Sequence, residues 1–124
     1  FLTALLTHFS DDNPYFHIFG HPTGRIIHKR EPYAVSLPKI FEKAKERNIA
    51  LEIDAYPDRL DLSDSSVRDA IQHKIKLAIG ADAHTKEHLA FFELGVSVAR
   101  RGWATKKDVI NCLNIQELRK FLKR

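Results

Sequence analysis

The sequence predicts an α/β domain in which parallel strands joined by crossover helices are followed by a helical carboxyl-terminal tail. Three observations support this fold class. Three short apolar runs each follow a segment with helical spacing, each run ends in a loop rich in His, Asp and Arg, and the last third has helical periodicity. With 124 residues, of which 44% are hydrophobic and 29% charged, the chain is long enough for one core. We expect one domain, or part of one, over residues 1–124.

The first two elements lie before a long polar loop. Residues 2–9 have apolar spacing compatible with a helix, and Tyr15–Phe19 is predicted to be a buried strand that ends at Gly20. After the loop, Leu37–Arg47 has apolar residues on one face and charged residues on the other. This pattern predicts an amphipathic helix, and Asn48 is a plausible stop.

The same order then repeats along the chain. Ile49–Ile53 is a mostly apolar run, typical of a parallel strand covered on both faces. Ser63 or Asp64 is expected to cap a helix over roughly residues 65–73, and Ile75–Ile79 is the third predicted strand.

The remaining residues, about 86–124, are predicted to be helical because apolar side chains recur at spacings of three and four. Right-handed crossover connections would bring the three loops that follow the strands to one end of the sheet. In α/β folds this carboxyl end carries the active site.

Composition restricts the kinds of site that the chain can build. A single cysteine, Cys112, excludes an internal disulfide and a cysteine-based zinc site, so a metal would need His and carboxylate ligands. No apolar run is long enough to span a bilayer, and residues 1–6 lack the features of a signal peptide. We therefore expect a cytoplasmic protein with no membrane partner.

Positive charge is concentrated near the carboxyl terminus. The net charge is +4 and the isoelectric point is about 9.3. From Arg100 and Arg101 onward, eight basic residues outnumber two acidic ones. This excess is either a solvated helix face or a surface that contacts a phosphate backbone, and the sequence leaves both interpretations open.

Candidate metal ligands follow two of the predicted strands. His21 comes directly after Gly20, and the third strand is followed by Asp82 and His84. In an extended segment, a D-x-H pair points both side chains to one face, where they can bind Zn²⁺, Mn²⁺ or Fe²⁺. These three residues do not complete a site, and each alone could instead stabilise its loop. We predict no catalytic group beyond such metal ligands.

Charged residues around the same loops have two interpretations each. Glu52 interrupts the second strand, where a buried carboxylate needs a partner: a metal-binding histidine, or an ion pair with Arg25 or Arg59. Arg25, Arg30 and Arg59 either bind phosphate or pair with neighbouring aspartates. His88 lies at a polar position of a helical segment and is expected to be solvated.

Five segments carry a resemblance to a known family: GHPTGR (20–25), REPY (30–33), ALEIDAYPDRLDLSD (50–64), GADAH (80–84) and GVSVARRGW (95–103). In this order and spacing they resemble the PHP (polymerase and histidinol phosphatase) domain at the carboxyl end of bacterial and archaeal family X DNA polymerases. The resemblance covers essentially the whole chain. It implies the carboxyl-terminal half of a distorted (β/α)7 barrel.

The resemblance also implies a chemistry. PHP domains hold a trinuclear cluster of manganese, zinc or iron that hydrolyses phosphoesters, and in family X polymerases they act as 3′→5′ exonucleases and process DNA 3′ ends for repair. His21, Asp82 and His84 match metal ligands of the family, and Glu52 matches a residue that supports the ligands. Asp54 replaces the usual Asn of that segment, so its role is open.

The family's first metal-binding motif, H-x-H, is absent, so the chain carries only part of the ligand set. We therefore expect a fragment that is inactive alone. Its expected partners are a DNA 3′ end, the upstream half of the PHP domain, a polymerase core, and a second copy, because half a barrel exposes a sheet edge. Two alternatives remain: a stand-alone phosphatase for a small ester such as histidinol phosphate, and a non-catalytic module that positions DNA.

Overall fold

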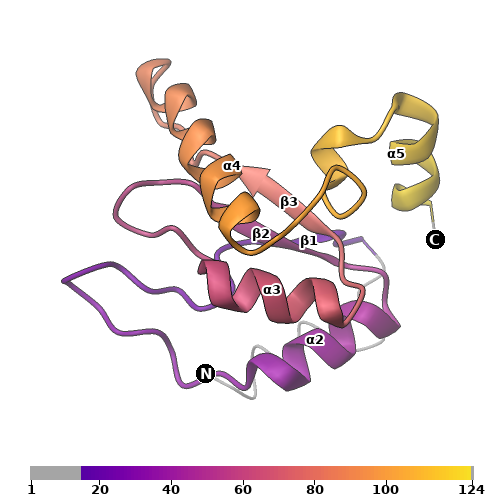
Figure 1. Cartoon of the computed structure of the whole chain (residues 1–124), viewed down its shortest axis with the longest axis horizontal. Helices are drawn as coiled ribbons and strands as arrows, with labels where there is room; N and C mark the ends of the chain where they lie inside the picture. Colours follow the sequence, from indigo (N-terminus) through magenta and orange to yellow (C-terminus); the bar gives the residue numbers. More distant parts are fainter. Residues whose placement is uncertain (1–14, 124) are drawn as a thin grey trace.

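A computed structural model describes residues 15–123, so the helix predicted over residues 2–9 lies outside the described part of the chain. The described residues form a parallel sheet of three strands in the order β1-β2-β3, with helices between successive strands (Figure 1). The elements are β1 (Ile18–Phe19), α2 (Leu37–Glu46), β2 (Ala50–Asp54), α3 (Asp64–Gln72), β3 (Leu77–Gly80), the 3-10 helix η1 (Glu87–Phe91), α4 (Phe92–Arg101), the 3-10 helix η2 (Ile110–Cys112) and α5 (Ile115–Leu122).

This architecture confirms the predicted α/β class with parallel strands. A closed or half barrel is not shown by these three strands and stays a prediction. Among residues 15–123, none of the helices combines the length and apolar character needed to cross a bilayer.

β1 and β3 are shorter than the apolar runs suggested, whereas β2 has the predicted length and is shifted by one residue toward the carboxyl terminus. β1 contains only Ile18 and Phe19, because these are the residues that pair with Ala50 and Leu51 of β2. The third strand does not begin at Ile75, because the backbone N–H of that residue is used at the end of α3.

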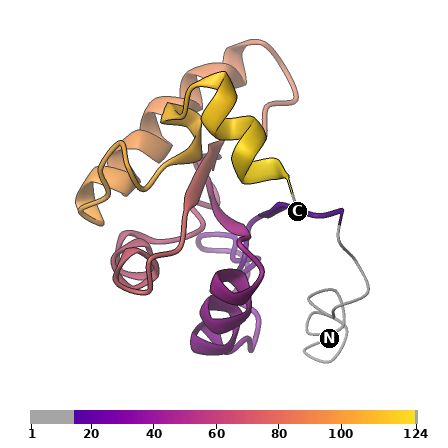
Figure 2. The same cartoon turned by 90° about the vertical axis from the view of Figure 1, so that its right-hand side faces the viewer.

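The two faces of the sheet are covered differently. Leu51, Ile53 and Leu77 lie in the main core, to which α2, α3 and α4 contribute. On the opposite face, a smaller cluster packs Ala50 and Ala78 against η2 and α5, and Figure 2 shows α2 and α5 on opposite sides of the sheet. Because side chains alternate between the faces of a strand, Glu52 shares this second face with Ala50, nearer the carboxyl ends of the strands.

Helices α2, α3 and α4 end in the same way. The residue after each helix cap has a left-handed backbone: Asn48 with φ 52°, Lys74 with φ 61° and Trp103 with φ 67°. In each case the next N–H returns to the carbonyl five residues earlier, as for Ile49 and Ala44, which defines a Schellman motif. Asn48 is confirmed as a stop. The stop at Trp103 was not predicted, and it divides the expected helical tail into α4, η2 and α5.

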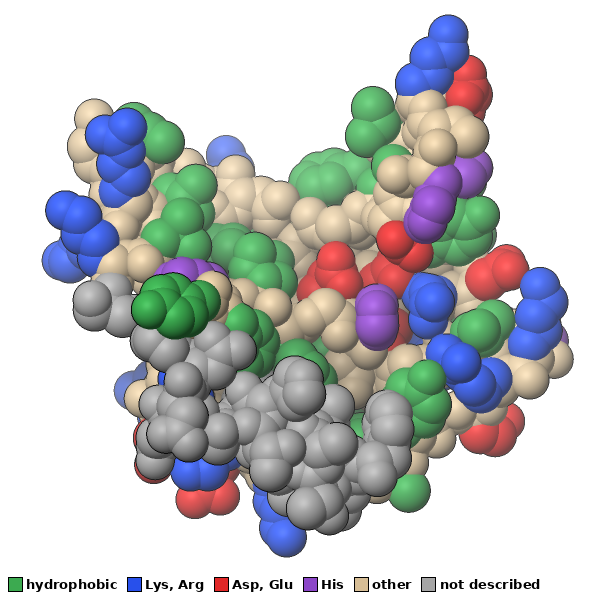
Figure 3. Space-filling view, turned by 180° about the vertical axis from the view of Figure 1, so that it is seen from behind, with side chains coloured by type: hydrophobic (Ala, Val, Ile, Leu, Met, Phe, Trp, Pro, Cys, Tyr) green, Lys and Arg blue, Asp and Glu red, His purple; other side chains and the backbone are tan. Residues whose placement is uncertain are grey.

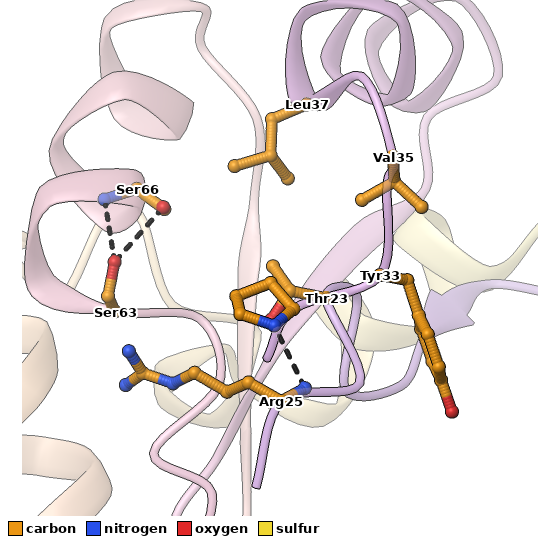
Figure 4. A pocket seen from close by; sticks show the side chains of 8 residues that line it. Thr23, Arg25, Tyr33, Val35, Leu37, Ser63 and Ser66 are labelled. Atoms are coloured by element: carbon orange, nitrogen blue, oxygen red, sulfur yellow. Dashed lines mark hydrogen bonds between the residues drawn. The ribbon is translucent and has the colours of Figure 1, made fainter. Parts of the chain in front are cut away.

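The start of α3 confirms the predicted cap. The Ser63 hydroxyl accepts the backbone N–H of Ser66 at 3.3 Å. Figure 4 shows these two serines turned toward each other at the edge of a small cavity of about 160 Å³, with Arg25 beside them. Their contacts are those of a helix N-terminus.

The loop between β1 and α2 is held in place by a buried carboxylate. Asp61 is completely buried, and its Oδ2 accepts the backbone N–H groups of Thr23 at 3.0 Å and Gly24 at 2.8 Å. Burial raises the pKa of Asp61, although these hydrogen bonds act in the opposite direction. Gly24 has φ 62°, and the ring of Tyr33 occupies the space that a Cβ would need.

We expect Asp61→Ala to lower the free energy of unfolding by about 1–3 kcal/mol, because two buried N–H groups lose their acceptor. Asp61→Asn retains an oxygen acceptor and removes the buried charge, so it should keep most of the wild-type stability at neutral pH. Urea unfolding compares the variants, and equal losses in both would contradict the anchoring role.

A comparison of wild type with Asp61→Asn tests the direction of the pKa shift of Asp61. A carboxyl with a raised folded-state pKa binds more protons in the folded state than in the unfolded state. Its contribution to stability therefore falls as pH rises from the ordinary carboxyl range through the raised pKa. Unfolding measured across this range should show a smaller decline for Asp61→Asn than for wild type.

Candidate functional site

The carboxyl ends of the three strands meet around the side chain of Glu52. Its Oε2 accepts the backbone N–H of His21 at 2.8 Å. A Cβ at Gly20 would lie 3.2 Å from this oxygen, and a Cβ at Gly80 would overlap the other carboxylate oxygen. Burial raises the pKa of Glu52, while the His21 N–H acts to lower it. The sheet thus accommodates a carboxylate at its centre because both flanking positions are glycine.

Arg59 lies between two further carboxylates. Its Nε is 3.4 Å from Oδ2 of Asp54 and 3.9 Å from Oδ2 of Asp82. The Asp54 side chain is 1% exposed and accepts the Tyr56 N–H at 2.9 Å. Burial raises the pKa of Asp54, against the Tyr56 hydrogen bond and the positive charge of Arg59. Nη1 of Arg59 is buried and has no acceptor among the described residues, so the guanidinium keeps an unused donor.

One interpretation predicted an ion pair of Glu52 with Arg25 or Arg59. No such ion pair forms among the described residues, and the Glu52 carboxylate accepts the His21 backbone N–H instead. The other interpretation was that Glu52 supports a metal-binding histidine. Glu52 does contact His21, which is one of the predicted metal ligands. The hydrogen bond is to the backbone N–H of His21, and the charge of the His21 side chain also acts to lower the pKa of Glu52.

An open cavity of about 360 Å³ lies beside Arg59. Figure 3 shows acidic, basic and histidine side chains gathered on this side of the molecule. The cavity is lined by Ile26, Lys29, Tyr56, Asp58, Arg59, Asp82, His84 and His88. Two of the three predicted metal ligands, Asp82 and His84, therefore share one cavity with a candidate phosphate-binding arginine.

The hydrogen bonding of His84 suits a metal ligand. Its Nδ1 lies 2.6 Å from the carbonyl oxygen of Asp82. Because a carbonyl only accepts hydrogen bonds, Nδ1 is assigned as the donor, and Nε2 is the nitrogen whose lone pair a metal would bind in this tautomer. Metal-binding histidines commonly donate their other N–H to a backbone carbonyl in this manner. The donor chemistry of His84 Nε2 and the Asp82 carboxylate fits a divalent ion such as Zn²⁺, Mn²⁺ or Fe²⁺.

The expected extended D-x-H geometry is wrong. Asp82 has φ 47°, so the chain turns sharply after β3, and the two side chains reach one cavity through this turn. His21 also has a positive φ, 30°. Positive φ is uncommon for residues other than glycine and often marks functional loops.

The predicted ligands do not form a complete metal site in this part of the protein. Across residues 15–123, no three His, Cys, Asp or Glu side chains are grouped closely enough to hold an ion. His21 lies at the end of β1 and is not among the residues that line the cavity containing Asp82 and His84. The chemistry of the donors fits a metal, and their number within the described chain does not suffice.

Four of the five arginines predicted to contact phosphate lie outside this cavity. Arg25 and Arg30 donate hydrogen bonds to backbone carbonyl groups and hold the loops together. The alternative interpretation expected them to pair with neighbouring aspartates, but neither forms such an ion pair among the described residues. Arg100 and Arg101 lie at the end of α4. Among these five arginines, Arg59 pairs with aspartates, as the ion-pair interpretation predicted. It also lines the cavity that holds Asp82 and His84, where the phosphate-binding interpretation would place a ligand.

An aromatic wall of the cavity was missed by sequence reasoning. His88 stacks on Phe91 with ring centroids 5.0 Å apart and meets Tyr56 edge-on at 5.4 Å. Its Nδ1 also accepts the His84 N–H at 3.3 Å. His88 is therefore partly buried in this cluster, and the expectation of a solvated side chain is wrong. The spacing of four between the two histidines was the available signal, but their contact with Tyr56 depends on tertiary structure.

Comparison with known proteins gives related sequences. The chain is 38% identical over 112 residues to the DNA polymerase/3′-5′ exonuclease PolX of Bacillus subtilis (strain 168), covering 90% of this chain and 20% of that protein. It is 26% identical over 117 residues to probable phosphatases of Thermoanaerobacter sp. (strain X514) and Thermoanaerobacter pseudethanolicus, covering 45% of each.

No protein-family profile matches the chain. The chain spans about a fifth of the length of PolX and less than half of the two phosphatases. These similarities support its assignment to a region related to PolX and to PHP-type phosphatases.

Proposed function

We propose that this chain is the carboxyl-terminal part of a PHP-type, metal-dependent phosphoesterase domain in a cytoplasmic family X DNA polymerase. The whole protein would remove nucleotides from DNA 3′ ends, in the 3′→5′ direction, during repair. The observation that carries the proposal is the meeting of Asp82, His84 and Arg59 in one cavity at the carboxyl ends of the strands. Similarity to PolX, whose name includes a 3′-5′ exonuclease, supports the choice of substrate.

Each residue of the site has a distinct proposed role. Asp82, the Nε2 of His84 and the imidazole of His21 would supply metal ligands, together with ligands from the upstream half of the domain. Bound Mn²⁺, Zn²⁺ or Fe²⁺, in a trinuclear cluster in the intact domain, would activate water and neutralise phosphate charge. Glu52 holds the His21 backbone. Arg59 would orient Asp82 and place positive charge beside a phosphate bound in the cavity that its side chain lines.

A second candidate is a phosphatase that acts on a small phosphate ester, such as histidinol phosphate. The similarity to two probable phosphatases favours it, although the identity is lower than that to PolX. Both candidates use the same ligands. They differ in whether the preferred substrate is a DNA 3′ end or a small monoester. Measuring the rate at which the whole protein hydrolyses each substrate distinguishes them.

In the whole protein, we expect His84→Ala and Asp82→Ala to lower Mn²⁺-dependent release of nucleotides from DNA 3′ ends by about a hundredfold or more, because each removes a metal ligand. Nucleotide incorporation, measured on a primed template, should stay unchanged. His28→Asn is a matched control, since His28 is exposed, lies outside the cavity and has a positive φ that Asn tolerates. Full exonuclease activity in both alanine variants would overturn the ligand assignment.

For the isolated 124-residue chain, we expect no Mn²⁺-dependent phosphodiester hydrolysis above buffer, because the described residues hold no complete ligand set. A phosphodiesterase assay with added Mn²⁺ measures this. Turnover that disappears in His84→Ala would contradict the proposal that ligands from another part of the protein are required.

The isolated chain is also expected to self-associate. Apolar residues Ile18 and Leu122 are 44% and 40% exposed and line a cavity of about 340 Å³ over the sheet face that carries Glu52. Sedimentation should show a dimer or larger species that Leu122→Glu dissociates. Leu89→Glu, at an exposed residue outside this cavity, is the control. A monodisperse wild-type monomer would contradict the expectation.

A further inference from the structure

A second surface, separate from the cavity at the strand ends, is built around Trp103. This residue follows α4, is the only tryptophan of the chain and is 67% exposed. The guanidinium carbon of Arg68 lies 3.8 Å from the centroid of its ring, in a cation–π contact. Arg68, on α3, also donates to the carbonyl oxygen of Arg101 at 3.3 Å. These contacts fix the indole on the surface and leave most of it accessible.

The backbone at this position makes a tryptophan unusual. Trp103 occupies the left-handed position of the Schellman motif, with φ 67°, where glycine is the common residue. The glycine of this turn stands one residue earlier, because a Cβ at Gly102 would lie 2.7 Å from Cβ of Val67 and 2.8 Å from the carbonyl oxygen of Asp64. A large ring therefore sits in an unfavourable backbone conformation without being buried. Burial in the described fold does not account for it, which suggests a function.

The surroundings of Trp103 are basic. Four exposed cations and no acidic residue lie between positions 100 and 107, and a fifth, Lys76, donates to the carbonyl of Lys107. Two acidic side chains nearby are engaged: Asp64 pairs with Arg101 at 3.0 Å, and Asp108 accepts the Thr105 hydroxyl at 2.8 Å. The four exposed cations are Arg100, Arg101, Lys106 and Lys107.

We propose that this surface binds single-stranded nucleic acid, with a base stacked on Trp103 and phosphates contacted by the surrounding lysines and arginines. Proteins that bind single strands combine an aromatic platform with cationic groups in this way. Single-stranded nucleic acid offers both features at once, because its bases are unpaired and free to stack. The proposal needs no metal and involves none of the residues assigned to the phosphoesterase site, so either can fail without the other.

The single tryptophan provides a direct measurement. A short oligothymidylate is titrated into the 124-residue chain at low salt with EDTA, and intrinsic fluorescence is followed. We expect saturable quenching of Trp103, and an affinity that falls with salt. A polyglutamate peptide of similar charge carries no bases, so it should compete weakly and leave the fluorescence unchanged.

Variants separate the two parts of the surface. Trp103→Ala should weaken binding, followed with a labelled oligonucleotide, by about fivefold or more, whereas Trp103→Phe should retain most of the affinity because it keeps a ring. Arg100→Ala/Arg101→Ala should reduce the slope of log K against log salt by about 1.4, as expected for two lost phosphate contacts on a single strand. The matched control is Lys39→Ala/Lys45→Ala on α2, where both lysines are exposed.

Circular dichroism establishes that each variant is folded before binding is measured. Saturable binding without quenching, wild-type affinity in Trp103→Ala, or equal quenching by polyglutamate would each overturn the proposal. The last result would identify the surface as a site for acidic protein segments.

Discussion

The structure depends on placing a carboxylate at the centre of a parallel sheet. Glu52 belongs to the middle strand, and its charge is costly in a partly buried position. Gly20, directly after β1, and Gly80, the last residue of β3, leave the space, and the His21 N–H supplies a hydrogen bond. β1 and β3 both end beside this carboxylate, and the loops with the candidate ligands begin there.

A second buried carboxylate is compensated just beyond the sheet. Asp54 is buried, and Arg59 is the cation that compensates it. Because Arg59 also lies near Asp82, the buried charge and the accessible one are electrostatically connected. A residue that compensates the charge of a buried aspartate thus also lines the cavity that contains Asp82 and His84. Fold stability and site geometry share these side chains.

The fold also uses one helix ending for two purposes. At Asn48 and Lys74, the Schellman turn directs the chain from a helix toward the next strand. At Trp103 the same turn presents an aromatic ring over Arg68, on a basic surface that shares no residue with the cavity at the strand ends. In the proposed whole protein, one surface would hold a single strand while the other acts on an end.

The sequence by itself determined the α/β class, the alternation of helices and strands, a helix cap at Ser63 or Asp64 and the stop at Asn48, because these follow from local spacing and local hydrogen bonds. The structure then selected Ser63 as the cap. It also identified the loops in which Asp82, His84 and Arg59 stand. Tertiary structure alone decided that Glu52 contacts the His21 backbone, that Asp61 anchors a distant loop, and that His88 packs on Tyr56. Each of these contacts joins residues far apart in the chain or depends on a left-handed turn. Long-range contacts and left-handed turns leave no periodic signal in the sequence.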